Sequence, residues 1–350
     1  MKNLLPNAPL RKGIALLLAT ILSIVIGMVA FWRFEIGELS LQSIWADANY
    51  GFLSLALLLI SSSMPFVAMR WRALFPKAQK SQGNPILLTG ILSAAFVLNL
   101  ALPGPVGELL SAGMVQKKTS IRFSTALAAL LVSRIIGLGS ACAIAAMMYW
   151  VAPFSIPEKW SIILQTAAIV LMLGSIGILG LAFFPQFFQR MYKLFSIRWL
   201  YERFSIYRKL ADMLEEVLSS LSQTASRGKM AYCESTFWAI GGHIMVASGI
   251  FFAAQAIDVS VSWSAITFTY AASIAASVAM FMLPGSGVAW DILFATTLSI
   301  SANIQELQAV SITLVVRLQQ LLVAGLGVAV VWWIAQDLLE TTPSTDEPAL

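Results

Sequence analysis

Two short stretches decide the fold of this chain: NLALPGPVGE at Asn99–Glu108 and LPGSGVAWD at Leu283–Asp291. Each places a Leu-Pro-Gly sequence inside a long apolar region. Proline removes a backbone donor and clashes with the preceding turn, and glycine weakens a helix, so a helix breaks at such a site. Each stretch therefore predicts a discontinuous helix or a helical hairpin at membrane depth. The residues expected to form the breaks are Pro103, Gly104, Gly107, Pro284, Gly285 and Gly287.

The composition around these stretches is that of a membrane protein. Of the 350 residues, 59% are hydrophobic and 11% are charged, whereas a soluble domain carries about 25% charged residues. Long apolar runs, able to cross a hydrocarbon core of about 30 Å, lie at 14–32, 50–69, 86–102, 124–150, 161–184, 235–257, 263–283 and 307–335. Two shorter apolar pieces, 106–116 and 288–301, follow the breaks. The sequence predicts an all-α polytopic membrane protein with about six full transmembrane helices and two broken or re-entrant hairpins.

The distribution of lysine and arginine orients these segments, because cytoplasmic loops carry an excess of both. If 86–102 and 106–116 return to the side they came from, 18 of the 22 Lys and Arg residues lie in the cytoplasm. They belong to the N-terminus, a 70–80 loop, a 117–122 loop and the 185–234 connector. If 86–102 crosses alone, only 8 lie inside and 12 outside. The returning hairpin is therefore favoured, with both chain termini cytoplasmic.

The spacing of charged residues indicates an internal repeat. Arg134 follows Glu108 by 26 residues, and Arg317 follows Asp291 by the same interval. Counting crossings brings the second hairpin in from the opposite face, which gives the inverted-topology repeat found in many transporters. We expect one transmembrane domain over 1–340, with repeat one at about 86–184, repeat two at about 235–335 and the connector 185–234 between them.

These four ionisable residues have two interpretations. Charged groups at membrane depth cost about 2.5–3.5 kcal/mol each on insertion scales, so they face the protein interior and pair. Glu108–Arg134 and Asp291–Arg317 are then structural pairs that close the hairpins. Alternatively, the arginines face a polar cavity, where a guanidinium binds phosphate bidentately and half-helix N-termini add N–H donors. The two interpretations are compatible if the pairs open. Beside the breaks, Asn99 and Ser286 are placed to bond freed backbone groups.

The connector and the tail suggest contacts outside the membrane core. Basic and aromatic residues alternate in 185–234, as in a helix that lies on an anionic cytoplasmic leaflet; an ordinary solvated connector is the alternative. The tail 341–350 has the composition of a disordered segment. Membrane topology accounts for the formal net charge of +5, so we expect no nucleic-acid partner. The oligomeric state is not predicted.

Enzyme chemistry finds little support in the sequence. One histidine and two distant cysteines make neither a zinc site nor a disulfide framework, so no metal and no cofactor are expected. The chain has no HExxH and no GxSxG sequence. A serine–histidine dyad of Ser286 and His243 would lack the sequence motif that usually surrounds such a dyad. A single histidine in an apolar helix, such as His243, is more often a packed polar residue than a proton carrier. We therefore expect no enzyme activity and no catalytic residues.

The motifs resemble the lysylphosphatidylglycerol synthase transmembrane-region family over roughly residues 10–335. That family includes the flippase-like half of the bacterial multiple peptide resistance factor and many inner-membrane proteins. The matching residues are Asn99, Pro103, Gly107, Glu108, Arg134, Pro284, Gly285, Asp291 and Arg317. The family often has arginine at the position of Ser111, and commonly has Arg-Glu where this chain has Trp290-Asp291. Both departures weaken the case for an aminoacylated phosphatidylglycerol substrate.

The resemblance implies a lipid flippase of a bacterial-type inner membrane, which moves a phospholipid or a lipid-linked anionic head group between leaflets. Its direction, energy source and head group are not predicted. The alternatives are a small-solute or ion transporter built on the same broken helices, and an intramembrane lipid-modifying enzyme. A lipid path requires a groove open sideways to the bilayer, whereas a solute carrier requires a closed vestibule.

Overall fold

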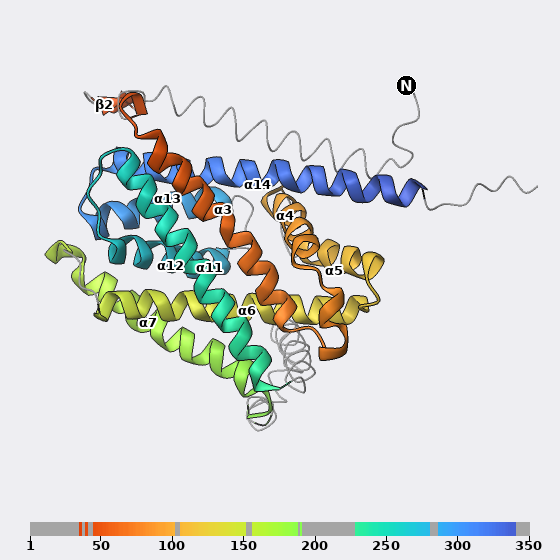
Figure 1. The fold of residues 1–350 in the computed structure, drawn as a ribbon. Coiled ribbons are helices and arrows are strands. Elements are labelled where there is room, and N and C mark those ends of the chain that lie inside the picture. The colour runs from red at the N-terminus through yellow and green to blue at the C-terminus, as the bar shows by residue number, and fades with distance from the viewer. Residues whose placement is uncertain are drawn as a thin grey trace, which may run out of the picture.

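The part of the chain that the structure describes folds almost entirely into helices (Figure 1). The computed structural model describes residues 35–36, 39–40, 45–101, 106–151, 156–187, 190, 228–280 and 286–340. The helices are α3 (Tyr50–Ala73), α4 (Pro85–Ala101), α5 (Val106–Lys118), α6 (Phe123–Val151), α7 (Glu158–Phe183), α11 (Lys229–Ala256), α12 (Trp263–Met280), α13 (Ser286–Ala302), α14 (Glu306–Glu340) and the 3-10 helix η1 (Lys77–Gln82). A strand pair that the sequence did not indicate, β1 (Glu35–Ile36) with β2 (Leu39–Ser40), precedes them.

Five helices in the described part are long and apolar enough to cross a membrane. They are α3, α6, α7, α11 and the Glu306–Gly327 part of α14. The remaining predicted span, 14–32 at the start of the chain, lies outside the described residues, as do the tail 341–350 and most of the connector 185–234. The prediction of an all-α polytopic membrane protein is confirmed.

Each predicted hairpin consists of two adjacent packed helices. Helix α4 packs against α5, and α12 packs against α13. With 13 residues, α5 is about 20 Å long, too short to cross a hydrocarbon core of about 30 Å. The breaks at 102–105 and 281–285 lie outside the described residues, including Pro103, Gly104, Pro284 and Gly285. Their conformation therefore stays a prediction.

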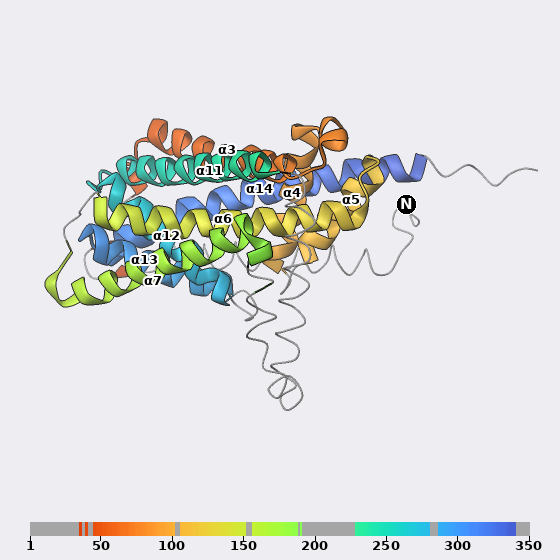
Figure 2. The same ribbon diagram turned by 90° about the horizontal axis from the view of Figure 1, so that it is seen from below.

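The packing of the helices is reciprocal between two groups of four. Helix α6, which follows the first hairpin, packs against α12 of the second; α14, which follows the second hairpin, packs against α4 of the first. Likewise α11 contacts α6 and α3 contacts α14, while α3 and α11 pack on each other. Figure 2 shows α3 and α11 side by side along one edge of the bundle and α7 along the other. Reciprocal packing is what two repeats related by a pseudo-two-fold axis produce.

In this pattern each helix of the first group has an equivalent in the second: α3 corresponds to α11, α4 to α12, α5 to α13 and α6 to α14. The pattern includes α3, which lies before the predicted repeat one at 86–184. It leaves α7 without a counterpart among the described helices, since α7 packs mainly on α6. The predicted repeat boundaries, and the entry of the hairpins from opposite membrane faces, stay predictions.

Small residues allow a close approach between α3 and α11. A Cβ atom added at Gly249 would lie 2.5 Å from a side-chain carbon of Ile60 and 2.8 Å from the carbonyl oxygen of Ala56. Without strong hydrophobic driving force inside a bilayer, helix pairs gain stability from such close van der Waals contact. The α3–α11 pair thus helps to hold the two groups of helices together, along with the α4–α14 and α6–α12 contacts.

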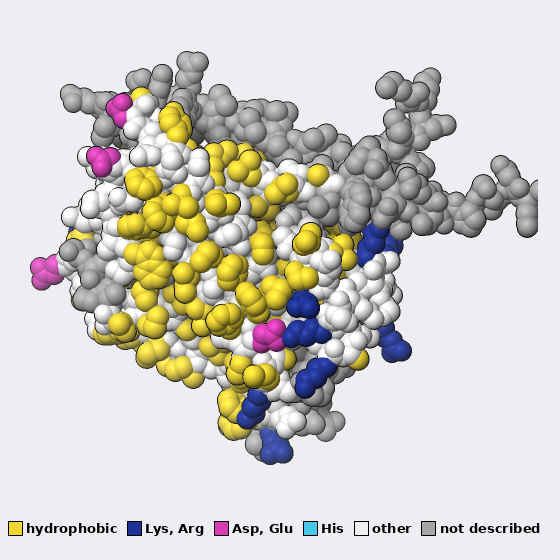
Figure 3. Space-filling view, in the orientation of Figure 1, with side chains coloured by type: hydrophobic (Ala, Val, Ile, Leu, Met, Phe, Trp, Pro, Cys, Tyr) yellow, Lys and Arg dark blue, Asp and Glu magenta, His cyan; other side chains and the backbone are white. Residues whose placement is uncertain are grey.

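Three hydrophobic clusters fill the interior of the described part, the smallest of them between α6, α7 and α12 around Phe268. Of the two larger clusters, one joins α3 to α6 around Trp71 and Leu130, and the other joins α3 to the C-terminal helices around Phe294 and Ile312. The outer wall is apolar as well, and Figure 3 shows hydrophobic side chains over the middle of the bundle with lysine and arginine gathered at one end. This separation agrees with the charge distribution from which the topology was predicted; which end is cytoplasmic stays a prediction.

Candidate functional site

The first ion pair joins the first hairpin to the helix that follows it. The Arg134 Nη2 atom of α6 lies 3.0 Å from the Glu108 Oε1 atom of α5, and the Asn99 amide donates to the same oxygen at 3.2 Å. The Glu108 side chain is 8% exposed, whereas that of Arg134 is 44% exposed. The pair is therefore a buried acid with a half-exposed arginine.

Asn99 also ties the two arms of the first hairpin together. The Gly107 N–H group at the start of α5 donates to the Asn99 Oδ1 atom at 2.9 Å. A Cβ atom at position 107 would lie 2.4 Å from that oxygen and 2.5 Å from the Ala95 carbonyl oxygen. Glycine is needed here because the first turn of α5 approaches the last turns of α4 so closely. The second carboxylate oxygen of Glu108 has no hydrogen-bond partner among the described residues, and neither has the buried Ser111 hydroxyl one turn after Gly107.

The second ion pair has the same placement in the second hairpin. The Arg317 Nε atom of α14 donates to the Asp291 Oδ1 atom of α13 at 2.7 Å, and Arg317 also bonds Gln320. The guanidinium carbon lies 5.5 Å from the centre of the Trp290 ring, which stacks on Phe294. Arg317 thus has a carboxylate, an amide and an aromatic face as neighbours.

The two pairs differ in which partner is accessible. In the first the arginine is 44% exposed and the acid 8%; in the second the arginine is 14% exposed and the acid 31%. One repeat therefore offers an accessible guanidinium, and the other offers a more accessible carboxylate.

The other predicted site residues take no part in the two ion pairs. Gly287 lies in the first turn of α13, and the side chain of Ser286 is outside the described part, so its predicted role stays a prediction. His243 packs between α6 and α12 and bonds neighbours other than a serine. No group of three or more His, Cys, Asp or Glu among the described residues could hold a metal ion.

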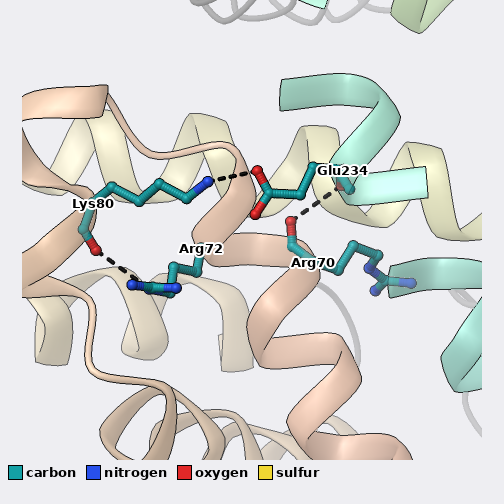
Figure 4. Close-up of polar contacts among 5 residues, drawn as sticks. Arg70, Arg72, Lys80 and Glu234 are labelled. Carbon is teal, nitrogen blue, oxygen red and sulfur yellow. Dashed lines mark hydrogen bonds and ion pairs between the residues drawn. The ribbon is translucent and has the colours of Figure 1, made fainter. Parts of the chain in front are cut away.

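Arg70 lies in a helix and not in the predicted loop. The prediction that it belongs to a basic 70–80 loop is wrong, because α3 continues to Ala73 and the Arg70 side chain is buried, with the residue only 6% exposed. Arg72, two residues on, does reach the loop and donates to the Lys80 carbonyl oxygen. Figure 4 shows the side chains of Arg70 and Arg72 extending in opposite directions, with the Lys80–Glu234 ion pair beside Arg72.

Arg70 enters a second polar cluster inside the bundle. Its Nε atom donates to the Ser133 hydroxyl of α6 at 2.9 Å. One turn further along α6, the His243 Nε2 atom of α11 lies 3.0 Å from the Gly137 carbonyl oxygen. That oxygen can only accept, so Nε2 carries the proton, and Nδ1 is left to accept from the Tyr270 hydroxyl at 3.4 Å. The cluster therefore links α3, α6, α11 and α12.

Together these features define a class: a multi-pass helical membrane protein with two packed hairpins and ion pairs between each hairpin and the next helix. The chain belongs to the lysylphosphatidylglycerol synthase transmembrane-region family, whose model matches residues 16–327. No curated protein and no solved structure matches the chain. Membership in this family supports a membrane function related to lipids.

Proposed function

We propose that this protein is a lipid flippase, which moves a phospholipid or a lipid-linked anionic head group between the leaflets of a bacterial-type inner membrane. The observation that carries the proposal is the Glu108–Arg134 pair. It sets an arginine with a 44% exposed side chain on a membrane-crossing helix, beside a short hairpin arm. A fixed guanidinium fork in such a place suits the phosphate of a lipid head group.

The ion pairs make opening of the path depend on the substrate. Removing one partner of a buried pair costs about 3–5 kcal/mol, because the other charge is left without compensation. A phosphate that replaces Glu108 at Arg134 compensates the guanidinium and so offsets part of that cost, whereas an empty protein bears all of it. Glu108 keeps the Asn99 amide as a donor when Arg134 turns to the head group. The proposed cycle is therefore an exchange of anions at Arg134.

The second pair completes the path in the proposal. Arg317 holds Asp291 at 2.7 Å, and the accessible partner there is the acid. A head group that carries a hydroxyl or ammonium group can bond Asp291 on the other repeat after it leaves Arg134. We propose that both pairs are functional as well as structural.

The proposal places both termini in the cytoplasm, with the connector 185–234 on the anionic cytoplasmic leaflet and phospholipids as the partners. It assigns no catalytic residue, since moving a lipid breaks no bond.

Reconstitution of the purified protein into vesicles with head-group-labelled phospholipids tests the function. We expect protein-dependent exposure of inner-leaflet label to a quencher that cannot cross the membrane. The same vesicles, loaded with radiolabelled inorganic phosphate, test the alternative of a small-solute or ion transporter. Release of phosphate without movement of any lipid by well-folded protein would establish that alternative and refute the flippase.

A further inference from the structure

Glu108 has one carboxylate oxygen that receives no hydrogen bond from the described residues. Its Oε1 atom lies 3.0 Å from the Arg134 Nη2 atom and accepts from the Asn99 amide at 3.2 Å. Its Oε2 atom is buried and has no partner in the described part of the chain. The Gly107 N–H group, at the start of the same helix, donates to Asn99 and not to the carboxylate. Arg134 is therefore the contact that compensates the charge of Glu108.

Arg134 is also the only charged side chain on the two helices with which α5 packs. Those helices are α4 and α6. Helix α4 contains no acidic, basic, histidine, cysteine or tyrosine residue, and Arg134 is the one charged residue of α6. The other titratable groups of α5 and α6 lie further along each helix: Lys117 and Lys118 in the last turn of α5, and Cys142 and Tyr149 on α6. On α3, Arg70 bonds Ser133 and not Glu108.

The two partners of the first ion pair differ in their freedom to leave it. The Arg134 side chain is 44% exposed and can turn outward, whereas the Glu108 side chain is 8% exposed and lies inside the hairpin. Once Arg134 turns to a head group, Glu108 keeps only the neutral Asn99 amide as a donor. The N-terminus of α5 favours the charged form, but more weakly than the lost ion pair did. A buried carboxylate without a counter-charge takes up a proton.

Helix α5 also offers an acceptor for the hydrogen bond of a protonated Glu108. A buried carboxylic acid O–H group needs such an acceptor. Ser111 is fully buried, and its hydroxyl has no hydrogen-bond partner among the described residues. It lies three residues after Glu108, on the same face of the helix. The neutral Glu108 side chain can therefore turn from Arg134 towards the Ser111 hydroxyl.

We propose that Glu108 is a proton-binding site, ionised while it pairs with Arg134 and protonated while Arg134 holds a head group. The proposal deepens the flippase function and rests on it for the event that opens the pair. The carboxylate gains a proton from the side on which the head group enters, and loses it on the other side when Arg134 returns. The negative charge of a phosphodiester and the positive charge of the proton cancel, so the two cross together without net charge.

Infrared spectroscopy of the purified protein in detergent at neutral pH tests the site, with Arg134→Gln compared with Lys80→Gln. Each variant removes the cation from a glutamate, but Glu108 is 8% exposed and Glu234 is 34% exposed. In the difference spectrum against wild type, we expect Arg134→Gln to gain the carbonyl band of a carboxylic acid and Lys80→Gln to gain none. The band should vanish when Glu108→Gln is added to Arg134→Gln. A folded Arg134→Gln protein without the band overturns the proposal.

The wild-type protein provides a second measurement if Arg134→Gln does not fold. Calorimetry of dihexanoylphosphatidylglycerol binding, repeated in buffers with different ionisation enthalpies, counts the protons that are taken up with the lipid. We expect proton uptake by wild type and the loss of this uptake in Glu108→Gln. Lipid binding by wild type without proton uptake overturns the proposal.

Reconstituted vesicles distinguish this proposal from the flippase function. For a pH difference of about one unit, coupling predicts a ratio of about ten between the leaflets for labelled phosphatidylglycerol. The excess should face the less acidic side, and Glu108→Gln should abolish it. Lipid movement that leaves the label equally distributed supports the flippase and refutes the proton coupling. The infrared band without movement of any lipid supports the proton site and refutes the flippase.

Discussion

Asp291→Asn and Arg317→Gln, made singly and together, measure how strongly the second ion pair is coupled inside the protein. Lys80→Gln and Glu234→Gln do the same for a reference pair at the end of the bundle. The reference pair is the shorter of the two, at 2.5 Å against 2.7 Å. Distance alone therefore predicts that the reference pair is the stronger.

The surroundings of the two ion pairs predict the opposite order of strength, with Asp291–Arg317 the stronger. The reference side chains are 30% and 34% exposed, and exposed pairs contribute about 0.2–1 kcal/mol. Arg317 is 14% exposed and lies on a membrane-crossing helix. Two unit charges 4 Å apart interact by about 4 kcal/mol at an effective dielectric constant of 20. Because Asp291 is 31% exposed, we expect a coupling of about 2–4 kcal/mol, below that of a fully buried pair.

Unfolding titrations with sodium dodecyl sulfate in mixed micelles give the free energies of unfolding for both double-mutant cycles. The coupling is the part of the double mutant's loss that the two single losses do not explain. Equal couplings for the two pairs, or a larger one for Lys80–Glu234, would refute the reasoning, because they would place Asp291 and Arg317 in a water-like environment.

Three further substitutions test the fold around the site. Gly107→Ala puts a Cβ atom 2.4 Å from the Asn99 Oδ1 atom and should cost about 1–3 kcal/mol through overpacking; a melting temperature equal to wild type would contradict the hairpin geometry. Gly249→Leu separates α3 from α11 and should lower the melting temperature further than Gly107→Ala, whereas the reverse order would show that this pair is not central. Trp71→Phe removes the donor at 3.0 Å from the Ala126 carbonyl oxygen, with an expected loss of about 1–3 kcal/mol. Denaturant titration checks it, and no loss would mean that the carbonyl finds another donor.

The sequence predicted the helices well because their signals are local. Leu-Pro-Gly marks the positions where α4 and α12 end, and apolar length marks the membrane-crossing helices. The common interval of 26 residues predicted the Glu108–Arg134 and Asp291–Arg317 combinations, which the structure shows as ion pairs. That interval equals one hairpin arm plus part of the next helix, so a local count was enough to find partners on neighbouring elements.

Arg70 was missed because its position depends on tertiary packing. It follows the apolar run directly, and a charge there is as typical of a loop as of a helix end. The available signal was the lack of any proline or glycine between Arg70 and Pro76. Its neighbours Ser133 and Tyr270 come from α6 and α12, and no spacing in the chain indicates that these helices meet α3. The unequal exposure of the two ion pairs likewise depends on how the helices pack.

Transbilayer movement of a head-group-labelled phospholipid is the most direct test of the central claim, with Arg134→Gln compared with Arg122→Gln. Arg122 is exposed, just before α6, and serves as the control of equal charge on the same segment. A charge-assisted contact is worth about 1.5–3 kcal/mol, and about 1.4 kcal/mol is a factor of ten in rate. We expect at least about tenfold slower lipid movement for Arg134→Gln and the wild-type rate for Arg122→Gln. Equal rates for folded Arg134→Gln and wild type would contradict a role of this arginine in the lipid path.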